Sequence, residues 1–144
     1  MAFDFSRFEY NVDESLLQTV LGELNQGKKS THWIWFIFPQ LRAPNQSETS
    51  RYFALRNLDE ASDFLQHEVL GPRLIECTQA VVQHQDRTAV EIFGEVDAKK
   101  FHRCMTLFSN VPEADPVFEQ ALEIFFNDGE GYGKKIEGRE GIIQ

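Results

Sequence analysis

The sequence predicts an all-α fold: a compact, multi-helical single domain of about six to eight helices. Three observations support this prediction. The chain has 144 residues, of which 42% are hydrophobic and 12% aromatic, so a domain of ordinary size can form around a sizeable core. Apolar residues recur at helical spacing in successive segments. No internal repeat, linker or second clear strand signal interrupts this pattern.

Charge and cysteine content narrow the classes of function. The formal net charge of -9 argues against a nucleic-acid partner, because such proteins normally carry a basic stripe. Cys77 and Cys104 each fall on the apolar stripe of a predicted helix, so we expect two small buried hydrophobes. The longest dense apolar stretch, residues 33–38, is far too short to cross a bilayer, and residues 1–10 hold no signal-peptide run. We therefore expect an acidic, soluble, cytoplasmic protein without a membrane partner.

The first predicted helix covers about residues 13–26. Asn11 or Asp13 can cap its start, and Gly27 suits the left-handed position just past its end. Its apolar stripe consists of Leu16, Leu17, Val20, Leu21 and Leu24.

The next segment, residues 31–40, is ambiguous because it is rich in aromatic and β-forming residues. A buried strand would fit this composition. However, a lone strand leaves its backbone groups unpaired, and no second clear strand is available to pair with it. We therefore expect a short buried helix or an irregular turn that ends at Pro39.

Three helices are predicted in the middle of the chain. A short helix over 49–55 follows the polar loop of residues 42–50. Asn57 or Asp59 then caps a helix that continues to about residue 66. The pair at 71–72, glycine followed by proline, marks the restart of a helix with proline in its first turn.

The last three predicted helices have clear starts. The spacing of residues 88–91 is that of a capping box, and Gly94 ends this short helix. We expect Asp97 to cap the next helix and the pair at 115–116 to open the last one. These helices complete a domain over residues 1–126, and residues 127–144 are expected to form a Gly-rich, charged C-terminal tail.

Standard catalytic motifs are missing from the sequence. It contains no phosphate-binding loop, dinucleotide fingerprint or nucleophile elbow. The four histidines include no His-x-x-x-His pair, so we predict no metal site, and no cofactor can be named. Candidate functional residues must therefore be sought among the polar and aromatic residues around the segment 31–40.

His32 lies beside two tryptophans, where burial would favour its neutral ring and prepare it for acid–base chemistry. Alternatively, it is a core histidine bonded to backbone. Trp33 and Trp35 can stack on a flat ligand, or they belong to the core with the many phenylalanines. Gln40 can bond a ligand from a rigid turn, or it caps its own loop.

Two further pairs are candidates. Arg51 and Tyr52 can hold a carboxylate or phosphate, since guanidinium makes a paired fork; the alternative is a surface salt bridge. Asp97 and Lys100 stand three positions apart on one predicted helix and are candidate catalytic residues with His32. In the simpler interpretation, Asp97 is a cap and Lys100 its solvated partner.

The run from Ser30 to Leu41 resembles the hallmark of the domain-of-unknown-function family 1810. The resemblance continues to about residue 126, through matching segments at 50–52, 58–61, 70–74, 91–94 and 105–108, and at Asp97 and Lys100. It implies an all-helical single domain but no activity. Members are sometimes labelled calpastatin, and no feature of this sequence supports a protease-inhibitor role. The sequence departs from the family pattern at 42–46 and at Arg103-Cys104, so a pocket there would differ in this member.

Two hypotheses of function follow. In the first, the protein is a small-molecule binder or enzyme, and its candidate residues converge on one cleft that takes a flat, anionic ligand such as a nucleotide. In the second, the protein is a non-enzymatic protein-interaction module, the aromatic segment is core, and an exposed apolar patch meets a partner. Oligomeric state does not follow from the sequence.

Overall fold

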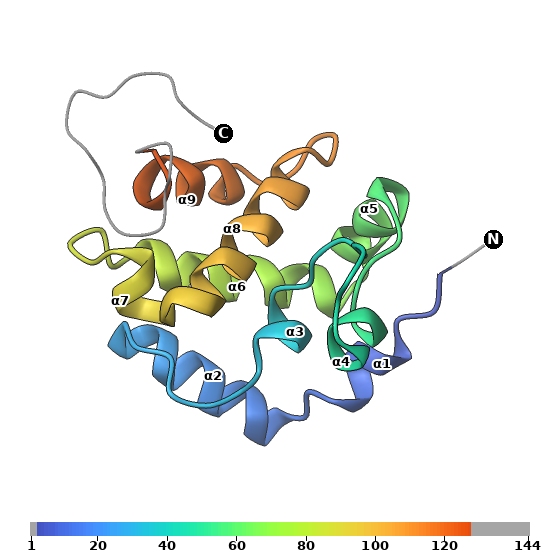
Figure 1. The fold of residues 1–144 in the computed structure, drawn as a ribbon, viewed down its shortest axis with the longest axis horizontal. Helices are drawn as coiled ribbons and strands as arrows, with labels where there is room; N and C mark the ends of the chain where they lie inside the picture. Colours follow the sequence, from blue (N-terminus) through green and yellow to red (C-terminus); the bar gives the residue numbers. More distant parts are fainter. Residues whose placement is uncertain (1–2, 128–144) are drawn as a thin grey trace.

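A computed structural model describes residues 3–127 of the chain. This part forms nine α-helices and no strand, which confirms the predicted all-α fold (Figure 1). Most of the expected tail lies outside the described residues. The helices are α1 (Ser6–Tyr10), α2 (Glu14–Gln26), α3 (Ile34–Ile37), α4 (Glu48–Tyr52), α5 (Leu58–Gln66), α6 (Leu70–Val82), α7 (Ala89–Phe93), α8 (Glu95–Ser109) and α9 (Val117–Phe125).

The helix that the sequence did not reveal is α1. It has five residues, too few to show a helical apolar period, and only Phe8 in it is buried. Its start is fixed by a local hydrogen bond from the Ser6 backbone N–H to Asp4 Oδ1 at 2.9 Å. The side chain of Phe8 makes an edge-on contact with Phe64, which attaches α1 to α5.

Most other helix ends match the capping signals of the sequence. Asp13 caps α2 and Gly27 ends it in the left-handed conformation, at a φ of 78°. The capping box of Thr88 and Glu91 starts α7. At α5 the structure decides between two candidates, because Asn57 accepts the capping hydrogen bond.

The prediction that Asp97 caps α8 is wrong. The helix begins at Glu95, and its N-cap is Gly94, which also ends α7. Gly94 has a φ of 84° and a ψ of 164°, a conformation open essentially to glycine alone, and this permits a sharp bend between the two helices. Asp97 therefore lies inside the first turn of α8, and its carboxylate is available for tertiary contacts.

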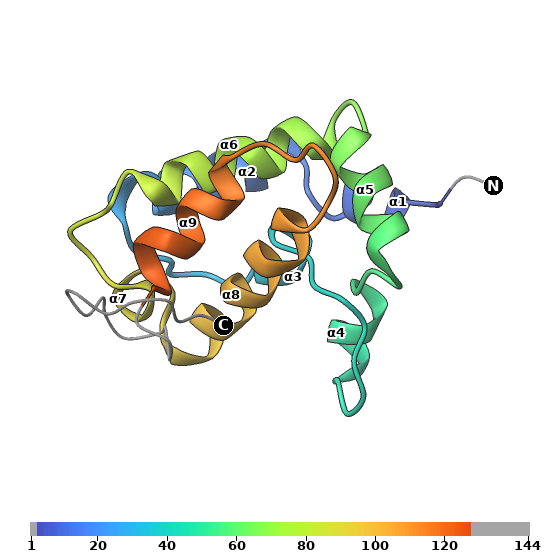
Figure 2. The same cartoon turned by 90° about the horizontal axis from the view of Figure 1, so that it is seen from above.

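The aromatic segment, residues 31–40, contains a single helical turn, α3, and not a strand. This agrees with the expectation of a short buried helix or an irregular turn. Just after this segment, an isolated β-bridge joins Leu41 to Leu55. Figures 1 and 2 show α3 in the middle of the molecule, and it contacts both α6 and α8. Ile34, Ile37 and Phe38 are buried there, so most of this segment is core.

The core is rich in phenylalanine. Phe101 of α8 lies at its centre, with its ring centroid 5.0 Å from that of Phe38 and 4.6 Å from that of Phe93. Cys77 and Cys104 are buried and unpaired, as expected. Burial, with a smaller contribution from Glu76, raises the pKa of Cys77 to about 12. Both thiols therefore act as small hydrophobic groups.

The arrangement has two ends. Figures 1 and 2 both place α7 at one end and α1, α4 and α5 at the other, with α8 between them. The long helices α6 and α8 connect the ends, and α9 packs on both. Among residues 3–127, no helix is long and apolar enough to cross a membrane.

Candidate functional site

Glu23 holds the segment that leads from α2 into α3. Its Oε1 accepts hydrogen bonds from the backbone N–H groups of Ser30 (2.8 Å) and Thr31 (3.1 Å) and from the indole Nε1 of Trp33 (2.9 Å). Its Oε2 accepts a bond from the Thr31 hydroxyl at 2.7 Å. Partial burial raises the pKa of Glu23, but these bonds to the charged form outweigh it and leave the pKa below the usual 4.5. The segment is thereby fixed against α2.

Lys29 lies in this segment and reaches α8. Its backbone N–H donates to the Ile92 carbonyl at 2.7 Å, which ties the segment to α7. Its ammonium Nζ lies 2.7 Å from Asp97 Oδ2, and its side chain is only 6% exposed. The same ammonium lies 5.1 Å from the centroid of the Trp33 ring. Lys29 and Asp97 therefore form a nearly buried ion pair that joins two distant parts of the chain.

Lys100 approaches the same carboxylate from its own helix. Its Nζ lies 3.5 Å from Asp97 Oδ1 and 4.4 Å from the centroid of the Trp35 ring. Asp97 thus has an ammonium group beside each of its oxygens. The longer distance to Lys100 indicates that Lys29 is the tighter partner.

These side chains line a pocket of about 430 Å³ at the junction of α7 and α8, which we call the Trp35 pocket. Residues 95–97 contribute to its wall, and their backbone N–H groups belong to the first turn of α8, which has no side-chain cap. A helix start of this kind carries partial positive charge. The pocket is lined by Lys29, His32, Ile34, Trp35, Phe93, Gly94, Glu95, Val96, Asp97 and Lys100.

Comparison with known proteins places the chain in a family. The family model described as "Protein of unknown function (DUF1810)" matches residues 2–135. The chain belongs to this family. It is also similar to the conserved hypothetical protein Rv1873 from Mycobacterium tuberculosis, whose crystal structure was determined at 1.38 Å. The two are 41% identical with a TM-score of 0.82, over 90% of this chain and 91% of that one. No curated protein matches the chain.

Four of the candidate residues meet in this DUF1810 member. His32, Trp35, Asp97 and Lys100 all line the Trp35 pocket. The expected burial of His32 is wrong, since its side chain is exposed. Trp33 is fully buried and donates to Glu23, so it has no free face for a ligand and belongs to the core.

The other three candidates do not reach the pocket, so the expected convergence on one cleft is only partial. Gln40 is buried, and its carbonyl accepts a bond from the Leu55 N–H at 2.8 Å. Arg51 and Tyr52 are exposed on α4, which both views place at the opposite end of the molecule from α7 (Figure 2). An Arg-Tyr pair next to each other in sequence says nothing about which end of the fold it occupies.

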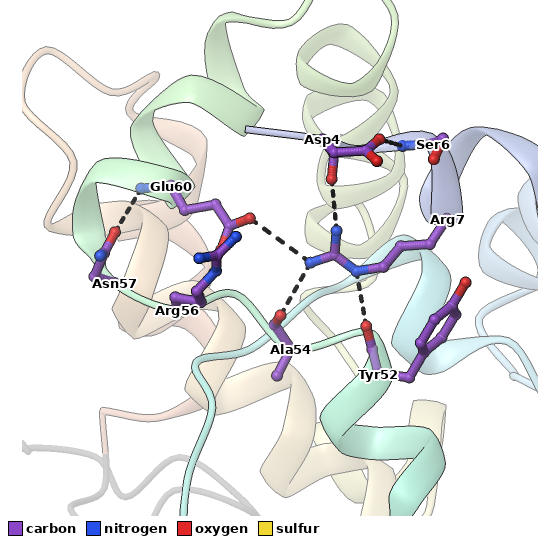
Figure 3. A network of polar contacts seen from close by, with 8 residues as sticks. All are labelled: Asp4, Ser6, Arg7, Tyr52, Ala54, Arg56, Asn57 and Glu60. Carbon is purple, nitrogen blue, oxygen red and sulfur yellow. Dashed lines mark hydrogen bonds and ion pairs between the residues drawn. The ribbon is translucent and has the colours of Figure 1, made fainter. Parts of the chain in front are cut away.

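Tyr52 instead takes part in a structural network around Arg7 and Glu60 (Figure 3). Arg7 Nε donates to the Tyr52 carbonyl at 2.7 Å, and Arg7 Nη2 donates to the Ala54 carbonyl at 3.1 Å. Glu60 is 1% exposed, accepts a bond from the Arg56 backbone N–H at 2.7 Å and lies 3.7 Å from Arg7. This network attaches α1 to the α4–α5 connection.

Three residues important for these arrangements were not predicted: Glu23, Lys29 and Glu60. Each acts on groups far away in the chain or on backbone, so no local spacing reveals it.

Trp35 also has an unexpected feature, because its indole Nε1 is buried without a hydrogen-bond partner. Within the described residues, no group of three His, Cys, Asp or Glu side chains is arranged to hold a metal ion.

Proposed function

We propose that the Trp35 pocket binds a small molecule that carries a flat ring and an anionic group. One observation carries this proposal: the half-buried ring of Trp35 and the ammonium of Lys100 lie together in a pocket at the uncapped start of α8. The volume of about 430 Å³ is within the range of small-molecule sites.

The anionic group of such a ligand would bind at the start of α8. Backbone N–H groups in a first helical turn and a nearby ammonium are a suitable environment for a phosphate or carboxylate. Lys29 remains paired with Asp97 at 2.7 Å, whereas the 3.5 Å contact of Lys100 is easily exchanged. Lys100 can therefore turn from Asp97 to the ligand without leaving that carboxylate unpaired.

The flat part of the ligand would pack on Trp35. An indole offers a large face on which a planar group can pack, and the Lys100 ammonium, 4.4 Å from its centroid, places a positive charge beside that face. The unpaired indole N–H supports a role beyond stability, since an unsatisfied buried donor costs about 1–3 kcal/mol. Departures from ideal packing of this kind are typical of functional sites.

The residues differ in the chemistry they can provide. His32 is exposed at the pocket and is our candidate proton carrier, because an imidazole ring can both accept and donate a proton. Each carboxylate oxygen of Asp97 has an ammonium group beside it. Asp97 therefore suits the role of positioning the two lysines better than the role of a free general base. Catalysis therefore depends on His32, while binding depends on Trp35 and Lys100.

The alternative function is a protein-interaction module, and the burial of Trp33 and its neighbours in the core favours it. Under this alternative the exposed large hydrophobics, such as Tyr10 and Val96, meet another protein. Size measurement in solution across a concentration series distinguishes the two. Self-association that is abolished by Tyr10→Asp, a change outside the Trp35 pocket, with no small-molecule binding, would favour the module.

The first experiment is a thermal-shift screen with nucleoside monophosphates, NAD-related metabolites and aromatic carboxylates. A ligand present at a hundred times its dissociation constant should add about 2.7 kcal/mol of stability. Hits are then titrated into Trp35→Leu and Lys100→Gln by calorimetry. We expect both variants to weaken binding at least about tenfold, since each removes one of the two contacts.

The control is Lys99→Gln, which removes the same charge from the neighbouring position of α8, outside the lining of the pocket. This variant should bind as the wild type does. His32→Ala should bind normally but lose any turnover of the ligand. Failure of every compound, or equal weakening by Lys99→Gln and Lys100→Gln, would refute the proposal.

A further inference from the structure

A second pocket lies beside the C-terminal half of α8. Its volume is about 630 Å³. One wall is the connection after α3, with Leu41 and Arg42; another is Leu58, the first residue of α5. The outer face of α8 closes it with Arg103 and Leu107. None of these residues lines the Trp35 pocket, so the two pockets are separate.

The apolar part of this pocket is exposed but preformed. Leu41 is 42% exposed and Leu58 is 39% exposed, while Leu107 between the walls is buried. Two backbone hydrogen bonds fix the loop wall, one from Arg42 N to Leu55 O at 2.7 Å and one from Leu55 N to Gln40 O at 2.8 Å. A concave apolar surface held in this way needs little rearrangement to accept a ligand.

Two arginines line this pocket, Arg42 and Arg103. Among the residues that the structure describes, neither Arg42 nor Arg103 has a hydrogen-bond or ion-pair partner for its guanidinium group. The chain has 23 acidic against 14 basic residues, so partners are abundant elsewhere on its surface. Two free guanidinium groups in one apolar pocket are therefore complementary to an anion, and their fork geometry suits a carboxylate or phosphate.

We propose that this second pocket binds a small molecule with an apolar body and a terminal carboxylate or phosphate. The apolar body packs on Leu41, Leu58 and Leu107, and the anionic end is held by Arg42 and Arg103. This site is independent of the Trp35 pocket, since it takes an aliphatic or bulky apolar anion and shares no side chain with that pocket.

The test uses three probes that share one alkyl chain and differ at the end: octanoate, octyl phosphate and octanol. Calorimetry gives their affinities for the full-length protein, and NMR spectra of leucine methyl groups locate the binding. We expect octanoate or octyl phosphate to bind at least about tenfold more tightly than octanol, because only the anions engage the arginines. The tighter of the two identifies the anionic group.

Arg42→Gln and Arg103→Gln should each weaken anion binding about tenfold and leave octanol binding unchanged. The matched control is Arg51→Gln, which removes an exposed arginine on α4 outside this pocket and should have no effect. Trp35→Leu should also have no effect, which separates this proposal from the previous one. Equal binding of octanol and the anions, shifts away from the three leucines, or equal weakening by Arg51→Gln would overturn the proposal.

Discussion

The two halves of α8 line pockets of opposite character. At the N-terminal half, Asp97 and Lys100 are parts of an ion-pair cluster that includes the nearly buried Lys29. At the C-terminal half, Arg103 faces a pocket with exposed leucines and has no partner among the described residues. In the first pocket Lys29, Asp97 and Lys100 are therefore paired with one another, whereas the two arginines of the second pocket have no ion-pair partner among the described residues.

Because of this difference, substitutions in the two pockets should affect the stability of the fold differently. In the Trp35 pocket, Asp97 is paired with the nearly buried Lys29, whose backbone N–H bonds Ile92 of α7, so a substitution of Lys29 or Asp97 disturbs the fold as well as the site. Among residues 3–127, the guanidinium groups of Arg42 and Arg103 have no hydrogen-bond or ion-pair partner that a substitution would remove.

The largest expected effect compares the two tryptophans. Trp33→Ala should cost about 3–5 kcal/mol, because it empties a fully buried site and removes the hydrogen bond to Glu23. Trp35→Ala should cost about 1–2 kcal/mol, since its ring is only half-buried. Urea unfolding of both variants measures the difference. Equal losses would mean that Trp35 is as much a core residue as Trp33.

The next effect compares the charges of the two pockets. Asp97→Ala leaves Lys29 nearly buried without a partner and should cost about 3 kcal/mol. Arg103→Gln should change stability by less than about 0.5 kcal/mol, because no partner is lost. Replacing Lys29 by Met in the Asp97→Ala background should recover part of the loss. If it recovers none, the cost does not come from the unpaired ammonium.

A smaller effect concerns pH and the segment that Glu23 holds, which leads into the Trp35 pocket. The pKa of Glu23 is lowered in the folded protein, so its contribution to stability is present above the ordinary value of 4.5. That contribution is lost as pH falls through the lower, folded value. Glu23→Gln should therefore be less stable than the wild type at neutral pH, and the gap should narrow in acid. A gap independent of pH would contradict the role of the carboxylate.

The smallest effect is a labelling rate. Cys104 lies on the buried face of α8, and burial raises its thiol pKa well above 9.0, so a thiol reagent should label it only when α8 opens. Substituting Arg42 or Arg103 should leave this rate unchanged. Asp97→Ala should increase it, since the start of α8 loses its attachment to Lys29. A rise in the arginine variants would show that the second pocket also supports the fold.

Several features were predictable from residues close together in the chain. The ends of α2 and α7 follow from Asp13 and Gly27 and from the capping box at 88–91, because a cap bonds groups within three or four residues. The short helix in the aromatic segment followed from the absence of a pairing strand. The placement of Asp97 failed because Gly94, with its positive φ, caps α8 and lets it begin three residues earlier than predicted.

The sequence by itself determined the helical class, the position of most helix ends and the burial of both cysteines, since these depend on local capping and apolar periodicity. Only the tertiary structure decided which polar residues meet. It brought Lys29 to Asp97, separated Arg51 and Tyr52 from His32, and placed Arg42 beside the face of α8 that carries Arg103. The physical reason is that such contacts depend on how helices pack against one another, and that packing is set by the whole core rather than by any segment of it.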